Sequence, residues 1–336
     1  VREMKHYDVI IIGSGGGTKI AGPAAELGLR VALVEEDAMG GTCLNRGCIP
    51  SKMLIYPADL VHDFDRAGRL NVRIDAVPQI QFRPLIDRVS AEVDGISAGL
   101  GRMYDTLEGV DLYRCRARFL EDKIIDLGGE QLTADRIFIA VGSRPSIPDI
   151  PGLAGTPYMT SKEALRETRL PKSMAILGAG FIACELGHVY ATAGCDVHFL
   201  VRSRLLRHED RDVQRTFGEV FGGRHRVHQG MTLVRVAFEE ERFRITLEDQ
   251  AGGTRVLETE AFLLAAGVVP NTDDLGLEQT GIRVSEDGFI VVDDTLKTSV
   301  DGIYALGDCI GNHFFRHTVN YEGCLLYTSD AADERG

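Results

Sequence analysis

Apolar runs alternate with helical patterns along most of the chain. Residues 7–12 (YDVIII) and 31–34 (VALV) are nearly continuous apolar runs, which are typical of parallel strands buried on both faces. A glycine-rich segment at residues 13–18 and a helical pattern up to Leu27 lie between the two runs. This order predicts a strand, a glycine turn, a helix and a second strand.

The same order returns in the second half of the chain. An apolar run at residues 174–177 leads into glycines at 178–183, a helical pattern up to Ala193 and another apolar run at 197–201. A lone glycine fingerprint is weak evidence, but each of these stands between a strand and a helix. The repeat predicts an α/β fold with two Rossmann-like dinucleotide-binding domains.

Other segments extend the two predicted domains. Charged and apolar residues alternate at helical spacing from Ala58 to about Gly109, which predicts amphipathic helices covering the sheet, interrupted at Gly95 and Gly101. The remaining patterns predict strands at 111–119, 123–126, 130–133, 136–140 and 262–264, and a hairpin at 243–258. A proline-rich linker at 145–157 and a return at 270–271 predict that the second domain is inserted in the first.

Composition narrows the possible partners. With 336 residues, 44 % hydrophobic and 26 % charged, the chain can bury two domain cores. A formal net charge of -13 without a basic run disfavours nucleic acid. The apolar stretches are far shorter than the roughly 20 residues that span a bilayer, so no membrane partner is expected. The charged N-terminal residues lack the pattern of a signal peptide, which makes the cytoplasm the expected compartment.

Candidate redox chemistry lies in residues 40–52 (GGTCLNRGCIPSK). A helix continuing from Ile49, with Pro50 in its first turn, would place Cys48 at the positive end of the helix dipole and Lys52 four residues further on. Both effects favour a thiolate, and Cys43 is a partner five residues away. A plain buried bridge or a metal site is the alternative, although no cysteine or histidine at ligand spacing supports zinc.

The segment at 40–52 closely resembles the redox-active segment of the flavoprotein disulfide reductases, the class I pyridine nucleotide-disulfide oxidoreductases. Dihydrolipoyl dehydrogenase, glutathione reductase, mercuric reductase and mycothione reductase belong to this family. The resemblance implies that Cys48 is the charge-transfer thiol facing the flavin and that Cys43 is the interchange thiol attacking the substrate disulfide. It also implies catalytic roles for Lys52 and Glu185, which would meet beside the nicotinamide.

The resemblance assigns FAD to the first domain, with a first part at 1–149 and a return segment at 272–323. Glu35 ends the second strand about 20 residues past the glycine turn, where an acid can bind the ribose of an adenosine. The sixth position of this fingerprint is Thr18 instead of glycine. The residues expected to bind FAD are Gly13, Gly15, Glu35, Gly41, Thr42, Lys52, Gly142 and Asp308.

The second domain, at 150–271, is expected to bind NADPH or NADH. Val201 stands where the first domain has Glu35, and arginines follow it. Loss of the acid and gain of guanidinium groups favour the 2′-phosphate of NADPH, although these arginines can equally be a solvated surface cluster. The family commonly has arginine where Val268 stands. The residues expected to bind the nucleotide are Gly178, Gly180, Arg202, Arg207 and Gly267.

The resemblance runs from Tyr7 to about Gly323, and family members continue into a C-terminal interface domain. We interpret residues 324–336 as a non-native tail resembling a translated sequencing adapter, with a genuine short form as the alternative. The resemblance implies a homodimer for the full-length protein and a base in the interface domain, so the truncated chain is expected to be inactive.

The resulting functional hypothesis is an FAD-dependent NAD(P)H dithiol/disulfide oxidoreductase of the dihydrolipoyl dehydrogenase type, acting on a lipoyl or small-molecule disulfide. Residues 180–183, 205–208 and 315–320 resemble mycothione reductase more, which gives an NADPH-dependent reductase of mycothione or another low-molecular-weight disulfide as the alternative. A hypothesis of another class is a non-catalytic nucleotide-binding fragment.

Overall fold

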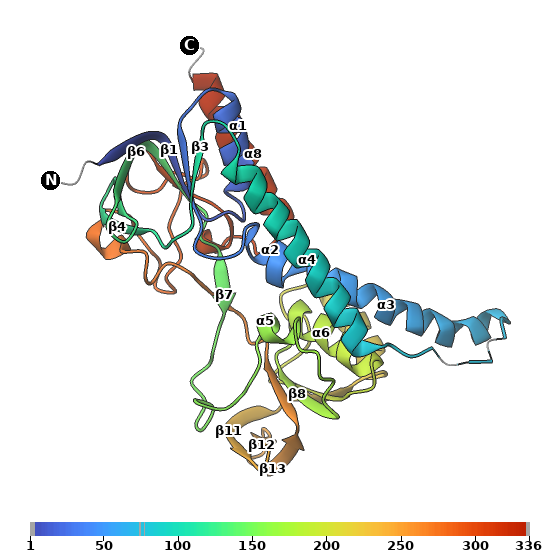
Figure 1. Cartoon of the computed structure of the whole chain (residues 1–336). Coiled ribbons are helices and arrows are strands. Elements are labelled where there is room, and N and C mark those ends of the chain that lie inside the picture. The colour runs from blue at the N-terminus through green and yellow to red at the C-terminus, as the bar shows by residue number, and fades with distance from the viewer. Residues whose placement is uncertain (1–3, 74, 77, 334–336) are drawn as a thin grey trace. The chain divides into compact units, whose positions relative to one another are not determined.

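The computed structural model describes residues 4–73, 75–76 and 78–333, which fall into two compact units (Figure 1). The first unit comprises Val1–Cys48, Val93–Arg144 and Val269–Gly336, and the second comprises Ile49–Glu92 and Pro145–Val268. The chain therefore leaves the first unit and returns to it, as the sequence predicts for an inserted domain. Residues 49–92 also belong to the second unit, so the functional limits 1–149, 150–271 and 272–323 stay a prediction.

The first unit is built on one mixed sheet of order β3-β2-β1-β6-β5-β4, with β16 also paired to β6. Its parallel strands are β1 (Lys5–Ile12), β2 (Val31–Val34), β3 (Val110–Tyr113), β6 (Gln131–Ile139) and β16 (Ile303–Ala305). Two further strands are antiparallel, β4 (Arg118–Glu121) and β5 (Ile124–Asp126). Parallel neighbours bring their carboxyl ends to one edge, where β1, β2, β6 and β16 each lead into a predicted site residue.

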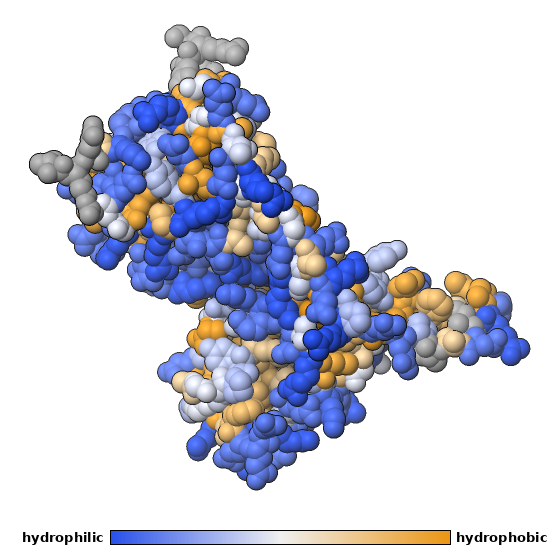
Figure 2. Space-filling view, viewed as in Figure 1, coloured by the Kyte–Doolittle hydropathy of each residue, from blue (hydrophilic) through white to orange (hydrophobic). Residues whose placement is uncertain are grey.

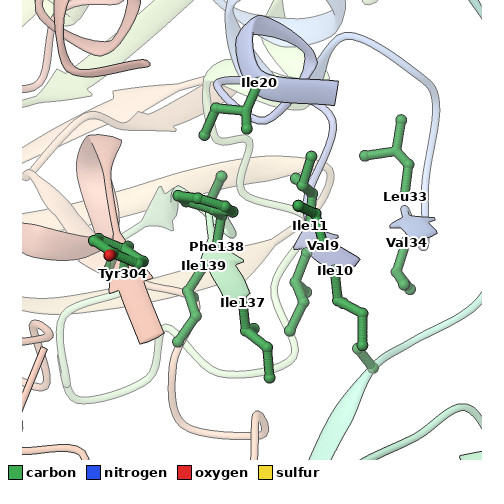
Figure 3. Close-up of a cluster of buried hydrophobic side chains, with 14 of the residues drawn as sticks. Val9, Ile10, Ile11, Ile20, Leu33, Val34, Ile137, Phe138, Ile139 and Tyr304 are labelled. Atoms are coloured by element: carbon green, nitrogen blue, oxygen red, sulfur yellow. The ribbon is translucent and has the colours of Figure 1, made fainter. Parts of the chain in front are cut away.

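The core of the first unit is the apolar surface of these parallel strands (Figure 3). Ile10, Ile11 and Ile137 are fully buried, and Phe138 stacks on Tyr304 with ring centroids 5.0 Å apart. Ile20 reaches this core from the helix that follows the first glycine turn. The apolar runs that predicted strands are therefore the residues that fill the core.

Helices α1 (Thr18–Glu26) and α8 (Arg316–Asp333) lie side by side in the first unit (Figure 1). They approach closely at Gly323, where an added Cβ would lie 2.8 Å from the Cβ of Lys19. Helix α8 continues through much of the segment 324–336 that we interpret as a non-native tail. Leu326 is buried and Leu325 packs beside it, while the non-native origin of this segment stays a prediction.

The second unit contains a parallel sheet of order β10-β9-β8-β14 and an antiparallel sheet of order β11-β12-β13. The parallel strands are β8 (Ser173–Leu177), β9 (Asp196–Val201), β10 (Arg226–Gln229) and β14 (Ala261–Leu264). The antiparallel strands are β11 (Thr232–Glu239), β12 (Arg242–Glu248) and β13 (Thr254–Thr259). Phe243 and Phe262 lie in the core that the two sheets share.

Short helices and a small strand pair complete the secondary structure. The remaining α-helices are α2 (Gly41–Arg46), α3 (Cys48–Ala67), α4 (Phe82–Asp105), α5 (Ser161–Ala164), α6 (Phe181–Thr192) and α7 (Arg211–Gly222). The 3₁₀ turns are η1 (Gly68–Leu70), η2 (Leu277–Gln279) and η3 (Gly307–Ile310), and β7 (Ser143–Pro145) pairs with β15 (Val268–Pro270).

Helix α4 corrects one expectation, because Gly95 and Gly101 lie inside it and do not interrupt it. Each glycine costs a helix about 1 kcal/mol relative to alanine. The buried side chains of Ile86, Val89 and Val93 lie on one face of α4, and their burial outweighs that cost. At Gly101 the missing side chain also leaves room for Arg114, whose guanidinium would lie 3.0 Å from an added Cβ.

Three strand predictions differ from the structure because pairing partners set the limits of a strand. The predicted strand at 111–119 is two strands, β3 and β4, which lie in different parts of the sheet. The predicted strands at 130–133 and 136–140 form the single strand β6, which pairs continuously with β1 apart from one residue. The hairpin at 243–258 is confirmed as β12 and β13, and β11 adds a third strand beside it.

An apolar face of α3 is exposed. Tyr56, Leu60 and Phe64 recur every four residues, with exposed fractions of 74 %, 50 % and 38 %. Apolar residues gather along this helix in the space-filling view (Figure 2). A search of the described residues finds no helix that is both long enough and apolar enough to span a bilayer.

Candidate redox-active site and nucleotide turns

The two candidate redox cysteines lie on consecutive helices. Cys43 is in α2, which the sequence did not predict, and Cys48 is the first residue of α3. Gly47 separates the helices, and a Cβ there would lie 2.9 Å from the carbonyl oxygen of Thr42 and 3.2 Å from the Cα of Cys43. A side chain at position 47 would therefore force the two cysteines apart.

The two thiols share a hydrogen bond that affects the acidity of Cys43. This bond with Cys48 raises the pKa of the half-buried Cys43 well above its ordinary range, and burial raises it further. The nearby charge of Arg316 acts in the opposite direction and lowers the pKa of Cys43. Ionisation of Cys43 is therefore opposed by Cys48 and by burial, and assisted by Arg316.

The first glycine turn follows β1 and leaves no room for side chains. Gly13 has φ +100°, and an added Cβ would lie 2.3 Å from the carbonyl oxygen of Ala140. Gly15 meets Gly41 at the start of α2, where a Cβ on Gly41 would lie 2.6 Å from the Cα of Gly15. The turn thus brings bare backbone to the edge of the sheet, as a bound pyrophosphate requires.

Carboxylates follow two of the parallel strands of the first sheet, β2 and β16. Glu35 follows β2 and accepts hydrogen bonds from the backbone N of Ser14 at 2.8 Å and from its Oγ at 2.6 Å. Asp308 follows β16 and accepts a hydrogen bond from Ser143 Oγ at 2.6 Å. Burial raises the pKa of Asp308, so its carboxyl is a largely desolvated acceptor. Gly142, beside Ser143, has φ +67°.

These residues fit FAD. A bare backbone turn, a carboxylate at the end of β2 and a desolvated carboxylate at the end of β16 are the groups that a pyrophosphate, a ribose and a polyol chain would contact. The structure brings Gly13, Gly15, Glu35, Gly41, Gly142 and Asp308 to the carboxyl edge of the first sheet. Thr42 is exposed at the start of α2, and its contact with the cofactor stays a prediction.

Lys52 and Glu185 form an ion pair within the second unit. Lys52 lies on α3 and Glu185 on α6, and Lys52 Nζ is 2.5 Å from Glu185 Oε1. Lys52 remains 61 % exposed in this pair, so water screens much of the attraction. The structure confirms the predicted contact, and the roles of both residues in hydride transfer stay a prediction.

The second glycine turn repeats the geometry of the first. Gly178 has φ +154°, and an added Cβ would lie 2.3 Å from the carbonyl oxygen of Ala265, which follows the neighbouring strand β14. Gly180 is the N-cap of α6, so the free N–H groups of the first helical turn point toward this end of β8. Gly267, past β14, has φ +121°.

The predicted arginines lie on the loop after β9. Arg202 and Arg207 are exposed, whereas Val201 before them is fully buried. The backbone N of Leu206 donates to the carbonyl oxygen of Ala179 at 2.7 Å, which fastens the loop to the glycine turn. Guanidinium groups are therefore available beside the second turn, as a 2′-phosphate would require.

Sequence reasoning overlooked several residues around these sites. Arg211 and Arg215 on α7 line a pocket with Arg204, and the spacing of four residues between them was the available signal. Gly47 stands between the cysteines in the sequence, but its effect depends on the break between α2 and α3. Arg316 was noticed only as part of a resemblance, without a role.

Comparisons with known proteins agree with this geometry. The family model described as pyridine nucleotide-disulphide oxidoreductase matches residues 7–323. A mercuric reductase of Staphylococcus aureus is 32 % identical over 95 % of this chain and 59 % of its own length. A mycothione reductase of Mycobacterium tuberculosis is 33 % identical over 96 % of this chain and 70 % of its own length.

Two further matches have other names. A dihydrolipoyl dehydrogenase of Halobacterium salinarum is 32 % identical over 94 % of this chain and 68 % of its own length. The Cu(II) complex of the HOCl-induced flavoprotein disulfide reductase RclA from Escherichia coli has a TM-score of 0.85 at 28 % identity. It covers 96 % of this chain and 70 % of that chain. This chain therefore spans about three fifths to seven tenths of the length of these relatives.

Proposed function

Because this chain belongs to the pyridine nucleotide-disulphide oxidoreductase family, whose members use FAD and NAD(P)H, we propose that the whole protein transfers electrons between NAD(P)H and a disulfide. FAD, when bound, supplies the two-electron chemistry that links the nicotinamide to the cysteine pair. The first unit offers the residues that would hold it, at the glycine turn and at Glu35 and Asp308. The second unit offers the turn at Gly178 for the nicotinamide nucleotide.

The cysteine pair performs the sulfur chemistry in this proposal. The thiolate of Cys43 attacks one sulfur of the substrate disulfide, and the other sulfur leaves as a thiolate that takes up a proton. The thiolate of Cys48 then attacks the sulfur of Cys43 and releases the second product thiol, leaving a Cys43–Cys48 disulfide. Two electrons and two protons convert the Cys43–Cys48 disulfide back to the dithiol. Each step runs in reverse when a dithiol is the substrate.

The observation that carries this proposal is the hydrogen-bonded pair of thiols on either side of Gly47. Two sulfurs in hydrogen-bond contact can form and break a disulfide with each other, which is the step that thiol–disulfide exchange requires. The pair is also partly accessible, with Cys48 exposed.

The substrate is best described as a lipoyl or low-molecular-weight disulfide. The dihydrolipoyl type stays our first choice, and the likeness to mycothione reductase supports an NADPH-dependent small-disulfide reductase as the alternative. The whole protein is proposed to be a homodimer, and the exposed apolar face of α3 supports a buried partner surface.

A soft metal ion is a second candidate substrate. The relatives named mercuric reductase and the Cu(II) complex of RclA motivate it. In this chain the favouring observation is that Cys43 and Cys48 place two sulfur ligands side by side, and thiolates bind soft metal ions strongly. Metal-dependent oxidation of NADPH that requires both cysteines would support this candidate over a disulfide.

Serine variants of the two cysteines test the proposal. We expect Cys43→Ser and Cys48→Ser each to abolish NADPH-dependent disulfide reduction while FAD stays bound. After reduction, Cys43→Ser should keep the long-wavelength absorption of a thiolate beside oxidised flavin, and Cys48→Ser should lose it. Cys324→Ser, which removes another exposed thiol, is the control. Equal absorption bands in the two variants would contradict the assigned roles.

The rate of disulfide turnover by the present chain tests whether Cys43 needs a proton acceptor. Among the residues that the structure describes, no histidine is among the groups with the largest effect on Cys43. A positioned base contributes roughly 10²–10⁴-fold to such a step. We therefore expect reduction of an artificial electron acceptor by NADPH to exceed disulfide turnover by a comparable factor. Fast disulfide turnover would reveal a base that this proposal lacks.

A further inference from the structure

Helix α8 fixes the position of Arg316 against the first glycine turn. An added Cβ on Gly16 would lie 2.5 Å from Val319 Cγ1, so the turn and the helix are in direct contact. One turn further along the helix, Glu322 Oε2 accepts a hydrogen bond from the backbone N of Gly307 at 2.8 Å. Arg316 is the first residue of α8, and these contacts limit how far its backbone can move.

The guanidinium of Arg316 is fastened to the same turn. Its Nη1 donates to the carbonyl oxygen of Gly15 at 2.8 Å, and Thr18 Oγ1 donates to that oxygen at 3.2 Å. Gly15 in turn touches Gly41, the first residue of α2, and Cys43 follows two residues later. A fixed positive charge is therefore held on the residue that touches the start of the helix carrying Cys43.

The electrostatics of Cys43 agree with this placement. The charged and titratable groups with the largest effect on it are Cys48, on α3, and Arg316, on α8. The hydrogen bond and negative charge of Cys48 raise the pKa of Cys43, whereas Arg316 lowers it. These two groups act on the same sulfur in opposite directions.

We propose that Arg316 is a positioning residue for thiol–disulfide exchange, which holds a positive charge beside Cys43 and thereby favours the attacking thiolate. This proposal rests on the proposed role of Cys43 as the interchange thiol. Cys48 makes Cys43 harder to ionise, and the charge of Arg316 offsets part of this effect before any base acts. Its hydrogen bond to Gly15 keeps the charge in place while Cys48 alternates between thiolate and disulfide.

The test measures the reactivity of Cys43 without requiring turnover. In the FAD-bound Cys48→Ser protein, the rate of alkylation by iodoacetamide is followed from pH 6 to 10, with the modified peptide identified by mass spectrometry. We expect Arg316→Gln to shift the midpoint of this profile upward by up to about 1 pH unit, as for the loss of one partly exposed opposite charge. The rate near pH 7 should fall by a corresponding factor of up to about ten.

Two matched variants separate charge from structure. Thr18→Val removes the other donor to the Gly15 oxygen and removes no charge, so it should leave the midpoint unchanged. Arg316→Lys keeps the charge, so it should restore most of the reactivity. The same alkylation midpoint in Arg316→Gln and the parent would overturn the proposal, and so would an equal shift in Thr18→Val. Because alkylation needs no substrate, absence of disulfide turnover in the full-length protein would contradict the proposed function and leave this test intact.

Discussion

Gly13 and Gly178 occupy equivalent positions at the ends of β1 and β8, and both lie against a carbonyl oxygen from a neighbouring strand. In each case an added Cβ would lie 2.3 Å from that oxygen. Real contacts of this kind are essentially never so short, so backbone must move to admit any side chain. The glycines are therefore required by the approach of two strands as well as by their positive φ.

Alanine substitution separates these two requirements. Gly194 also has a positive φ, +109°, but its added Cβ would meet nothing within 4 Å. We expect Gly194→Ala to lower the free energy of unfolding by about 1–2 kcal/mol, the cost of left-handed backbone. Gly178→Ala should cost about 1–3 kcal/mol more, because it adds a steric clash.

Urea unfolding of both variants, followed by circular dichroism, provides the measurement. Titration with NADPH should also show weaker binding for Gly178→Ala, because the clash displaces the turn that would hold the pyrophosphate. Equal losses of stability in the two variants would mean that the close approach at Ala265 relaxes without cost.

Residues that stand in strong local patterns could be picked out from the sequence, and their roles stay predictions. Cys43 and Cys48 stand in a distinctive segment, and Glu35 and Asp308 follow apolar runs that become the parallel strands β2 and β16. Gly47 and Arg316 could not be assigned in this way. The effect of Gly47 depends on a helix break, and Arg316 is 301 positions away from the carbonyl of Gly15 that it binds.

At the scale of elements, helices α3 and α6 meet along a series of polar contacts within the second unit. Lys52 pairs with Glu185 at the start of the series. Further along, Asp59 Oδ1 lies 3.1 Å from His188 Nε2, and His62 Nε2 lies 3.2 Å from Thr192 Oγ1. Contacts that advance together along both helices set their register, and this register supports the ion pair of Lys52 and Glu185.

Histidines form a stacked group at this helix contact. The rings of His62 and His188 stack with centroids 4.9 Å apart, and His225 meets His188 edge to face at 5.9 Å. Burial, followed by the charge of His62, lowers the pKa of His188, although Asp59 acts against this shift. Burial and the charges of His188, His62 and Arg224 lower the pKa of His225 to about 4.

These shifts predict loss of stability in acid. A histidine whose folded pKa is lowered takes up protons more readily when unfolded, so its stabilising contribution is complete above pH 6.5. The contribution is lost as the pH falls toward 4. Since His225 is only partly buried, we expect a loss on the order of 1–2 kcal/mol from this group. His225→Phe should flatten the dependence, because Phe221 and Phe199 already surround this ring.

Urea midpoints of the parent and the variant, measured from pH 7.5 to 4.5, test this expectation. His208→Phe serves as a control, because His208 is exposed and is not one of the three stacked histidines, His62, His188 and His225. Parallel pH curves for the parent and His225→Phe would show that the acid sensitivity comes from other groups.

Helices and strands with strong local sequence patterns were predicted better than those with weak ones. The strands with continuous apolar runs were predicted closely, whereas β6 was divided because Ala134 and Asp135 weaken the pattern in its middle. Pairing with β1 restores the strand there, which no local pattern shows. The short helix α2 was missed because it depends on the turn at Gly40 and the contact of Gly41 with Gly15.

At the scale of the whole molecule, the two units differ at one equivalent position. Glu35 follows β2 in the first unit, and the corresponding strand of the second unit ends with the buried Val201 and continues into exposed arginines. The difference is local, and it is the reason for expecting NADPH, and not NADH, at the second unit.

Replacement of the arginines tests this division. We expect the double variant Arg202→Leu, Arg207→Leu to raise the KM for NADPH by about ten-fold to a hundred-fold. This is the equivalent of one hydrogen bond to a charged group, at roughly 1.5–3 kcal/mol, because both arginines are exposed and water screens part of each contact. The KM for NADH should change little, since NADH has no 2′-phosphate. Arg242→Leu, on β12, is the matched control.

Steady-state kinetics with an artificial electron acceptor supply both constants without requiring disulfide turnover. A parent enzyme that already prefers NADH would contradict the electrostatic assignment of these arginines.

The first unit consists of three separate segments of the chain, and this affects how the chain folds as it is synthesised. The parallel and antiparallel sheets of the second unit are complete once β14 has emerged, at Leu264. The first sheet still lacks β16 at that moment, and α1 still lacks its neighbour α8. Contacts between residues far apart in sequence form late, because a long loop must close first. The N-terminal strands therefore stay partly uncovered until the residues that follow the inserted unit have been made. A released chain that ends near residue 270 should resist protease in its middle and not at its beginning.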